Sequence, residues 1–502
     1  MRASVIDLGY NSLKMVSYKI RSDNSFRAYD QRGSLTRLGE GLQQTGYLGE
    51  LAMKRTLREL ALLKEVNRLS QVDRVLAITT SPVREAANGE WFKGEAEAVL
   101  GLKFRVLSGK EEALFSYVGA ARSTRFPDAL FFDLGGGSLE FTCTRGYRVR
   151  KILSLPIGAL RMSELYSGED RRFSKKDYAR MGRRIAEMLP TREELGLAEG
   201  TVLLGVGGTL RALAKYDQWM REYPLNKLHG YRLRRKSILA INKRLRKMDA
   251  RRIAGLDAVG RDRAESFAAG ALVISTMMSK LKFDDVVVST HGLRDGVLSE
   301  YLRDPARYAR ERFDEQKANS SMALWRAREA GTEAFSGALA SRGVITLGEK
   351  LILDEAIESF LDLYLKTRPE SLFYTIVNED SYLEHRDQVT LAISLVRAKS
   401  PKAANWFLAR HRSILSEGTK ESTVRLAAMI HLAEVLEMTK STARFRVQDG
   451  ALTFQVNTSQ NEFPKLLLER AARELEGVTG RMVKTIISRS RERAQVAPLA
   501  GR

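Results

Sequence analysis

The sequence Asp133-Leu134-Gly135-Gly136-Gly137-Ser138-Leu139-Glu140 decides how this chain folds. Apolar segments flank it, and we predict strands over Leu130–Asp133 and Leu139–Thr144, joined by the glycine turn. Each glycine in such a strand pair costs roughly 0.5–1 kcal/mol, and close approach of the backbone to a ligand is a common compensation. Asp133 and Glu140 bring two carboxylates to the same rim of the turn, as a Mg²⁺ site requires. A glycine-rich hairpin without a ligand is the alternative.

A second turn of the same kind lies near the N-terminus. It has the sequence Asp7-Leu8-Gly9-Tyr10-Asn11-Ser12 and precedes the first by 126 residues. We predict strands over Ser4–Leu8, Leu13–Ile20 and Phe26–Leu35. The glycine lets backbone N–H groups turn toward an anion, and Asn11 and Ser12 add side-chain donors, although an ordinary β-turn has the same features. Two such turns between apolar strands indicate two similar halves that face each other across a cleft.

Strands and helices alternate through the first 300 residues or so. We predict strands at Val72–Ile78, Phe104–Leu107, Thr201–Gly205 and Asp285–Ser289, and helices at Leu51–Leu69, from Pro82, from Gly109 and after the turn Gly207-Gly208-Thr209. This alternation indicates an α/β fold. Residues 306–442 are mostly helical in pattern. A hairpin over residues 443–457, turning at Asp449-Gly450, a helix over Lys465–Leu475 and a basic tail over Arg489–Arg502 follow.

The composition favours an anionic partner. Lys and Arg number 83 against 61 Asp and Glu, which gives a net charge of +22. Such an excess attracts nucleic acid, polyphosphate or an acidic membrane surface, but it also serves solubility alone. The single cysteine, Cys143, excludes an intramolecular disulfide and a cysteine-based zinc site, and we predict that it lies in the core. The N-terminus has no signal-peptide pattern and no apolar run approaches the roughly 18 residues of a membrane span, so we expect a cytoplasmic protein.

Several further segments, in order and spacing, match one family. They are Thr79-Thr80-Ser81-Pro82-Val83-Arg84-Glu85-Ala86, Leu107-Ser108-Gly109-Lys110-Glu111-Glu112-Ala113, Arg263-Ala264-Glu265 with Ala269-Gly270, and Gly292-Leu293-Arg294-Asp295-Gly296-Val297-Leu298. Together with the three turns they resemble the exopolyphosphatase/guanosine-pentaphosphatase (Ppx/GppA) family. This family is the hydrolase branch of the actin/sugar-kinase/heat-shock ATPase superfamily. The resemblance is strong over residues 1–303 and weak over 304–502.

The resemblance implies a domain plan. It consists of two ribonuclease-H-like (actin-like ATPase) lobes around a cleft, at residues 1–124 and 125–304. A mostly α-helical HD-like domain at 305–442 and a small α+β unit at 443–502 follow. The HD phosphohydrolases hold metal through His and Asp. Here only His385, His411 and His431 lie beyond residue 304, so we expect a degenerate domain whose histidines are packing residues.

The resemblance also implies roles for residues of the cleft. Glu112 corresponds to the catalytic base that activates water, and Arg84 and Arg263 to arginines that contact phosphate. The phosphate cradle corresponds to Asp7, Gly9, Asn11, Ser12, Gly135, Gly136, Gly137, Ser138, Gly207, Gly208 and Thr209. Asp133, Glu140 and Glu112 correspond to carboxylates at a Mg²⁺ ion. Tyr10 departs from the small residue usual in the first turn, and we expect it to narrow the pocket.

Each of these residues also has a purely structural interpretation. Glu111 and Glu112 begin a helix, where acidic residues are favoured by the dipole in any case. Arg84 lies in the first turn of another helix, and Arg263 lies in a charged cluster where it could simply be ion-paired.

The function implied is that of an exopolyphosphatase, which removes terminal phosphate from inorganic polyphosphate. The same motifs would serve a guanosine pentaphosphate 5′-phosphohydrolase, and a non-enzymatic polyphosphate or nucleotide sensor is the alternative of another class. A kinase or ATPase of the superfamily is disfavoured because Ser108-Gly109-Lys110-Glu111-Glu112-Ala113 is typical of the hydrolase branch. We expect a homodimer with no membrane or nucleic-acid partner, and we expect residues 306–502 to extend the track for the polyanion.

Overall fold

The computed structural model describes residues 1–22, 24–124, 126–168, 172–260, 263–310, 333–341, 343–379, 381–438, 442–448, 451–458 and 462–489. The chain divides into two units, Met1–Asn319 and Ser320–Arg502. None of the helices in the described part combines the length and the apolar character that a membrane span needs.

The first sheet of unit 1 has five strands in the order β3-β2-β1-β4-β5. They are β1 (Arg2–Leu8), β2 (Leu13–Ile20), β3 (Phe26–Ser34), β4 (Arg74–Thr79) and β5 (Phe104–Val106). β1 pairs antiparallel with β2 and parallel with β4. The helices that follow these strands are α1 (Leu42–Thr45), α2 (Glu50–Leu69), α3 (Ser81–Glu85), α4 (Gly89–Leu100) and α5 (Gly109–Ala121). Both sides of β1 and β2 are apolar, since each strand is covered on both faces.

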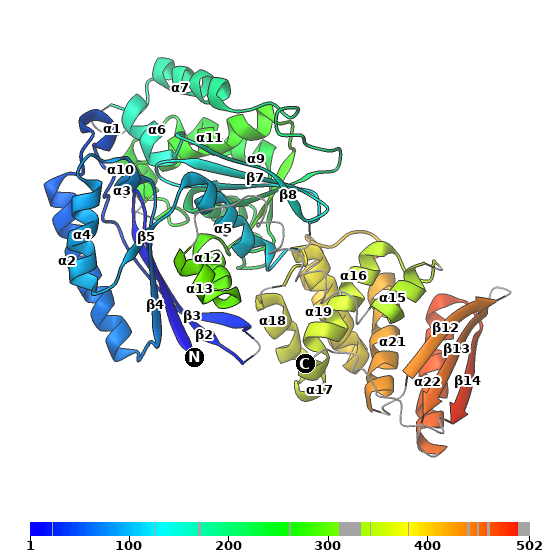
Figure 1. Ribbon diagram of the computed structural model, residues 1–502. Coiled ribbons are helices and arrows are strands. Elements are labelled where there is room, and N and C mark those ends of the chain that lie inside the picture. The colour runs from blue at the N-terminus through cyan, green and yellow to red at the C-terminus, as the bar shows by residue number, and fades with distance from the viewer. Residues whose placement is uncertain are drawn as a thin grey trace. The chain divides into compact units, whose positions relative to one another are not determined.

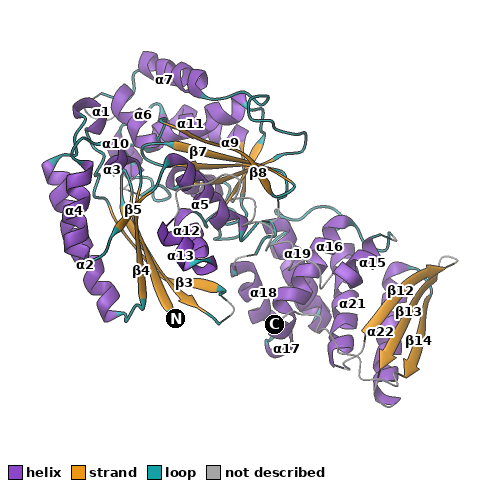
Figure 2. Ribbon diagram, in the orientation of Figure 1, coloured by secondary structure: helices purple, strands orange, loops and turns teal. Residues whose placement is uncertain are grey.

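The second sheet repeats the plan of the first. Its order is β10-β11-β9-β6-β7-β8, from β6 (Ala129–Leu134), β7 (Leu139–Arg145), β8 (Arg148–Leu155), β9 (Val202–Val206), β10 (Arg232–Arg234) and β11 (Asp285–Val288). β6 pairs antiparallel with β7 and parallel with β9, as β1 does with β2 and β4. The two similar halves predicted from the paired turns are therefore present. Both sheets stand out in Figure 1 and, as orange strands, in Figure 2.

Two helices pass between the sheets and position the site. α5 contacts β6, β7 and β8 of the second sheet, while α12 (Leu293–Arg303) contacts β1 of the first. The two helices are in close backbone contact at two glycines. A Cβ added to Gly296 would lie 1.7 Å from the carbonyl oxygen of Phe115, and a Cβ added to Gly119 would lie 2.0 Å from the carbonyl oxygen of Gly292. Larger residues at these positions would separate the helices, so the glycines set how deeply the start of α5 reaches into the cleft.

The outer face of the second sheet is covered by helices around a large apolar core. They are α6 (Ala159–Tyr166), α7 (Lys175–Met188), α8 (Gly208–Met220), α9 (Arg235–Leu245), α10 (Ala250–Ala254) and α11 (Phe267–Lys280). Cys143 is buried in this core, as predicted, and burial raises the pKa of its thiol to about 12. A last helix of the unit is α13 (Pro305–Arg310).

Unit 2 is helical and then mixed. Its helices are α15 (Glu333–Ala340), α16 (Leu347–Glu355), the π-helix Ala356–Phe360, α17 (Leu361–Lys366), α18 (Pro369–Asn378), α19 (His385–Lys399), α20 (Pro401–Arg410) and α21 (Thr419–Met438). The hairpin β12 (Thr442–Gln448) and β13 (Ala451–Thr458), helix α22 (Glu462–Thr479) and strand β14 (Val483–Arg489) follow, and β14 pairs parallel with β13.

The sequence analysis found most of these elements and missed three strands. β8, β10 and β14 were not predicted, and β14 includes Arg489, which we had assigned to the tail. The hairpin turn expected at Asp449-Gly450 and residues 490–502 lie outside the described residues. His385 and His411 are buried packing residues, as predicted. The prediction was wrong for His431, which is partly exposed and pairs with Glu474 at 2.7 Å.

Candidate active site

The two glycine turns have the same geometry and touch each other. Gly9 N–H donates to the Ser12 carbonyl at 3.1 Å, and Gly135 N–H donates to the Ser138 carbonyl at 3.0 Å. A Cβ on Gly136 would lie 3.3 Å from Cβ of Asn11. The loops predicted to form the phosphate cradle are thus brought together from both lobes.

Tyr10 closes one side of this contact. Its ring is buried and packs directly on two glycines. A Cβ added to Gly39 would lie 2.6 Å from the Tyr10 ring, and a Cβ added to Gly137 would lie 2.7 Å from it. Because both neighbours are glycines, the ring fits between the lobes. Tyr10 thus fills space beside the two loops, in keeping with the narrowing expected from the sequence.

The hairpins place charged residues at equivalent positions. Asp7 pairs across its hairpin with Lys14, and Asp133 pairs across the other with Glu140. The first hairpin therefore contributes a cation where the second contributes a carboxylate. The sequence analysis overlooked Lys14, although its place opposite Asp7 follows from the length of the turn.

Glu111 and Glu112 have different surroundings. Glu111 closes the N-terminal capping box of α5: its carboxylate accepts from Ser108 N–H and Ser108 Oγ, both at 2.9 Å, and from Arg105 at 2.6 Å. Oε2 of Glu112 is buried and accepts no hydrogen bond from the described residues. The stabilising role that a helix start offers is thus filled by Glu111, and Glu112 is left facing the other acidic groups.

Three carboxylates gather beside the glycine turn. Asp133 accepts from Ser116 Oγ at 2.7 Å, and Glu140 accepts from Ser154 Oγ at 2.9 Å, while Oε2 of Glu140 has no partner among the described residues. Burial, and then the charge of Glu140, raise the pKa of Glu112 well above its usual range. Burial, and then Asp133, raise the pKa of Glu140 to about 8. Burial also raises the pKa of Asp133.

Two of these carboxylates offer oxygen ligands for a cation. The unpartnered buried oxygens of Glu112 and Glu140 are hard ligands of the type Mg²⁺ prefers. Among the described residues, however, no three or more His, Cys, Asp or Glu side chains are arranged as a complete metal site. Mg²⁺ commonly binds through one or two carboxylates and completes its shell with water and substrate phosphate.

Four cations, Lys14, Arg211, Arg263 and Arg294, lie close together beside Asp7 and Asp133. Arg294 donates to Asp7 at 2.8 Å. Burial, and then the charges of Arg294, Arg211 and Arg263, lower the pKa of Lys14 to about 7. Burial and the same neighbours, Arg294 and Arg263, lower the pKa of Arg211 to about 10. Several cations so close together and removed from solvent indicate a site for a multiply charged anion.

Arg263 lies directly over the third predicted loop. A Cβ on Gly208 would lie 1.8 Å from its Nη1. Thr209 packs against Gly270: a Cβ added to Gly270 would lie 2.7 Å from the methyl carbon of Thr209. Gly207 has a φ of 112°, which side chains rarely adopt. Arg263 thus packs against the Gly207–Thr209 loop, and the contact of both with phosphate stays a prediction. Arg261 and Asp262, the other members of its charged cluster, lie outside the described residues.

Arg84 is held beside Glu112. Its Nη1 donates to the Leu107 carbonyl and lies 4.0 Å from Oε2 of Glu112. The hydrogen bond to Leu107 holds the guanidinium beside the N-terminal end of α5, and the Arg84–Glu112 contact is an ion pair without a direct hydrogen bond.

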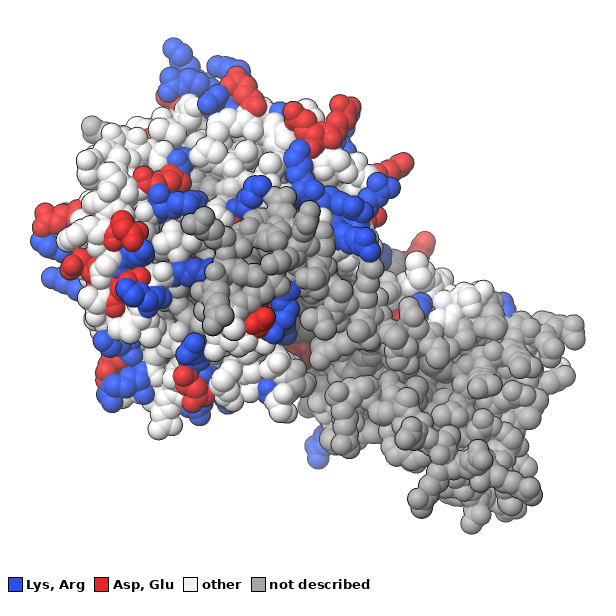
Figure 3. Space-filling model, in the orientation of Figure 1, with Lys and Arg blue, Asp and Glu red and all other residues white. Residues whose placement is uncertain are grey.

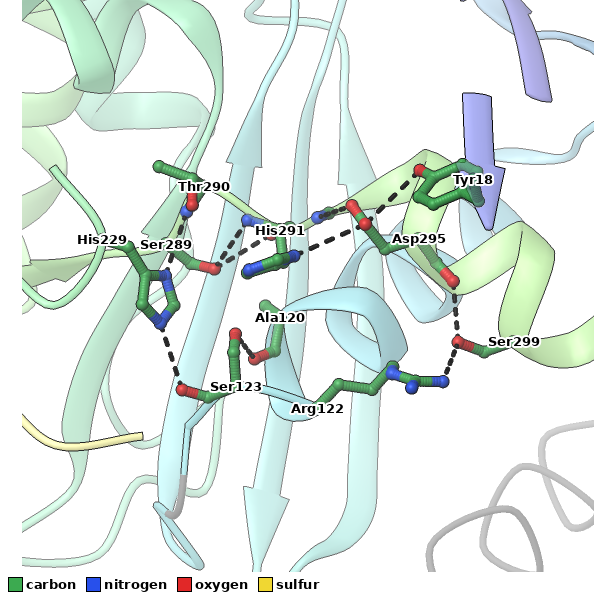
Figure 4. A network of polar contacts seen from close by, with 11 residues as sticks. Tyr18, Ala120, Arg122, Ser123, His229, Ser289, Thr290, His291, Asp295 and Ser299 are labelled. Atoms are coloured by element: carbon green, nitrogen blue, oxygen red, sulfur yellow. Dashed lines mark hydrogen bonds and ion pairs between the residues drawn. The ribbon is translucent and has the colours of Figure 1, made fainter. Parts of the chain in front are cut away.

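Two further residues missed in the sequence tie the lobes around the site. Arg161 of α6 donates to the Gly137 carbonyl at 2.7 Å, to Gln43 and to Glu85, both at 2.6 Å. Asp295 holds the start of α12, accepting from Gly292 N–H at 3.0 Å and from Tyr18 of β2 at 3.3 Å, with His291 at 3.4 Å (Figure 4). These contacts position Arg294, the residue before Asp295, against Asp7. Asp295 belongs to the segment Gly292–Leu298 that carries the family resemblance, whereas no local signal marks Arg161 as part of the site.

Comparison with known proteins agrees with this arrangement. Residues 19–304 match the model of the Ppx/GppA phosphatase family. The Aquifex aeolicus member of that family, in its crystal structure, is 26% identical, with a TM-score of 0.50 over 61% of this chain and 98% of its own. An exopolyphosphatase from Cytophaga hutchinsonii has the same fold, at 23% identity and a TM-score of 0.56 over 61% of this chain and 99% of its own. A bifunctional 3-dehydroquinate synthase/phosphatase from Fusobacterium nucleatum is 26% identical over 318 residues, which are 60% of this chain and 46% of that protein.

The fold and the site define a two-lobed, actin-like α/β core whose glycine loops meet at a mixed cluster of carboxylates and cations. The chain belongs to the Ppx/GppA phosphatase family.

Proposed function

We propose that this protein is an exopolyphosphatase that hydrolyses the terminal phosphoanhydride of inorganic polyphosphate and releases orthophosphate. The observation that carries the proposal is the meeting of two charge sets at the glycine loops. The cations Lys14, Arg211, Arg263 and Arg294 lie close to one another and to Asp7, and Asp7 also lies near Glu112, which has an unpartnered carboxylate oxygen. Phosphoryl transfer requires this combination of charge neutralisation and a positioned group that orients the attacking nucleophile.

Glu112 would accept a proton from the attacking water. Its raised pKa makes the ionised carboxylate a stronger base than that of an exposed glutamate. The loops Gly9–Ser12, Gly135–Ser138 and Gly207–Thr209 would direct backbone N–H groups at the terminal phosphate. Arg84 and Arg263 would hold its non-bridging oxygens by planar, two-pronged hydrogen bonds.

We propose Mg²⁺ as the cofactor, which Glu140 and Glu112 would hold through their unpartnered oxygens, with Asp133 beside them. When bound, the ion would neutralise charge that develops on the phosphate oxygens. It would also favour the ionised forms of Glu112 and Glu140, whose pKa values are raised by burial and then by a neighbouring carboxylate, Glu140 for Glu112 and Asp133 for Glu140.

Guanosine pentaphosphate is the alternative substrate. The cradle described above would hold its terminal phosphate equally well, and the base and ribose would lie beyond it. The net charge of +22 favours a long polyanion, because many phosphates can be bound at once. A non-enzymatic sensor is disfavoured by the buried, unpartnered carboxylate of Glu112, a costly group that binding alone does not require.

Phosphate release from long polyphosphate, tripolyphosphate, guanosine pentaphosphate and ATP, compared in parallel with Mg²⁺, tests the proposal. We expect the highest kcat/KM with long polyphosphate. A clear preference for guanosine pentaphosphate would replace the proposed substrate, and no release from any of the four would favour the sensor.

We also propose a cytoplasmic homodimer, by resemblance to the family. Three parts of the domain plan stay predictions: the HD-like character of residues 305–442, the separate unit at 443–502 and the lobe boundary at 124/125. Light scattering of the purified chain would test the dimer, with a mass close to the monomer's 56.4 kDa as the contradicting result.

A further inference from the structure

The positive charge of the chain is concentrated in one segment. On the face drawn in Figure 3, Lys and Arg side chains are interspersed with Asp and Glu over much of the visible surface of unit 1. Residues 232–252, in contrast, contain ten Lys and Arg and a single acidic residue, Asp249. This segment of 21 residues therefore supplies nine of the 22 net positive charges.

Helix α9 in this segment turns its cations outward. It buries Ile238, Ile241 and Leu245, and Asn242 donates to Ser275 of α11 at 2.6 Å. The opposite side carries the exposed cations Lys236, Lys243 and Arg244, and exposed Lys247 lies in the turn directly after the helix. The helix is thus anchored by one face and presents a charged stripe on the other.

Three carboxylates near this segment, Asp249, Asp284 and Asp285, interact with groups outside the stripe. Asp285 pairs with Arg232 at 2.6 Å and Asp284 with Arg235 at 2.7 Å. Asp249 caps α10 by accepting from Arg252 N–H at 2.8 Å. In the described part of the chain, no carboxylate pairs with the four cations of the stripe. Their mutual repulsion is a cost that an anionic ligand would relieve.

An exposed tryptophan borders the stripe. Trp219, at the end of α8, is 64% exposed. Its ring stacks on that of Tyr216, with 5.8 Å between the ring centroids and 15° between the ring planes. The next residue, Met220, contacts Arg244 at 3.3 Å, and Arg221 donates to Ser237 of α9 at 2.8 Å. These two contacts tie the end of α8 to α9. A flat indole, supported from below by Tyr216, is therefore held beside the cations.

We propose that this surface, formed by Trp219 and the α9 stripe (Lys236, Lys243, Arg244 and Lys247), binds single-stranded nucleic acid. The exposed cations would attract the phosphate backbone, and the indole offers a stacking platform for a base; sequence-tolerant single-strand binding combines these two features. Inorganic polyphosphate has no ring to stack, so it would use the cations alone. The surface is separate from the phosphate cradle, because α8 extends thirteen residues from Gly208 at the cradle, or about 18 Å at 1.5 Å per residue.

The test is binding of a short, fluorescently labelled single-stranded RNA, measured by anisotropy over a salt series. With the full chain we expect affinity that falls steeply with salt. The variant Lys243→Ala/Arg244→Ala/Lys247→Ala should lower the slope of log affinity against log salt by about 2, since each phosphate contact on a single strand contributes about 0.7. Trp219→Ala should weaken binding about 5- to 100-fold with the slope unchanged, which is the usual worth of one stacked base.

Two matched controls come from the same chain. Lys402→Ala/Arg410→Ala/Arg412→Ala removes equal charge from exposed positions of unit 2, and Trp91→Ala removes a 60% exposed tryptophan from α4. Both should bind RNA as the parent does. All variants should release phosphate from tripolyphosphate at the parent rate.

The proposal is overturned if the α9 variant and the unit 2 variant lose RNA affinity equally, or if Trp219→Ala binds RNA as the parent does. It is also overturned if the α9 variant loses binding to vesicles of anionic phospholipid while the parent binds no RNA. In that case the surface would be a membrane contact.

Discussion

Nη1 of Arg84 lies 4.0 Å from Oε2 of Glu112, and this buried oxygen accepts no hydrogen bond from the described residues. A buried carboxylate oxygen without a partner is costly. The neighbouring Glu111, one residue earlier, satisfies both of its oxygens through Ser108 and Arg105. The protein thus maintains one costly acidic group at the point where the glycine loops of two lobes meet. The cost is understandable if a water, a cation or a phosphate completes the site.

Stability should depend on pH through Glu140. Its pKa is raised from 4.5 to about 8, so between these values the folded protein holds a proton that the unfolded chain has released. Stability from this group is therefore fully present below pH 4.5 and is lost as the pH rises toward 8. We expect the melting temperature, measured with a chelator present, to fall over this range. Glu140→Gln should show a smaller fall, because an amide does not titrate. Parallel curves for the two proteins would contradict the assignment.

The close approach of Arg263 to Gly208 predicts how the substitution Gly208→Ala, which adds one methyl group, changes phosphate release. A Cβ at this position would lie 1.8 Å from Nη1 of Arg263. Because a guanidinium is the end of a flexible side chain, Gly208→Ala should fold and displace it. Phosphate release should fall by about 10²-fold, the usual worth of one positioned donor.

Gly94 of α4 provides the matched control for this substitution. No heavy atom lies within 4 Å of its Cβ position. Gly94→Ala should keep full activity and gain about 0.5–1 kcal/mol of stability from helix propensity. An active Gly208→Ala enzyme would show that the position of Arg263 is unimportant.

Removal of divalent cations should stop the reaction and leave the fold intact. The reason is that burial, and then the charge of a neighbouring carboxylate, raise the pKa of both Glu112 and Glu140 and so favour their protonated forms when no cation is bound. We expect phosphate release to vanish in a chelator, with an unchanged circular dichroism spectrum, and to return when Mg²⁺ is added. A full rate in the chelator would assign the carboxylates another role.

Much of the fold could be predicted from local patterns. The turns at Asp7 and Asp133 share spacing and flanking strands, and the structure confirms the repeat they indicated. Strand β10 was missed because its three residues, Arg232–Arg234, include two exposed arginines and give no apolar signal. β14 was missed because its parallel pairing with β13 depends on partners distant in sequence.

The site was predicted less completely than the fold. Lys14 and Arg211 lie on a strand and a helix with no motif of their own, and they enter the site only because the lobes face each other. The difference between Glu111 and Glu112 depends on the direction of each side chain, which the sequence does not contain. Such cross-lobe relationships need the three-dimensional structure.

The most direct measurement compares phosphate release by Glu112→Gln and Glu111→Gln with long polyphosphate and Mg²⁺. Glu112→Gln should keep its melting temperature and substrate affinity while turnover falls at least about 10²-fold, the usual worth of a positioned base. Glu111→Gln should lose about 1 kcal/mol of stability through its weakened cap and keep its turnover. Near-normal turnover in Glu112→Gln would contradict the account.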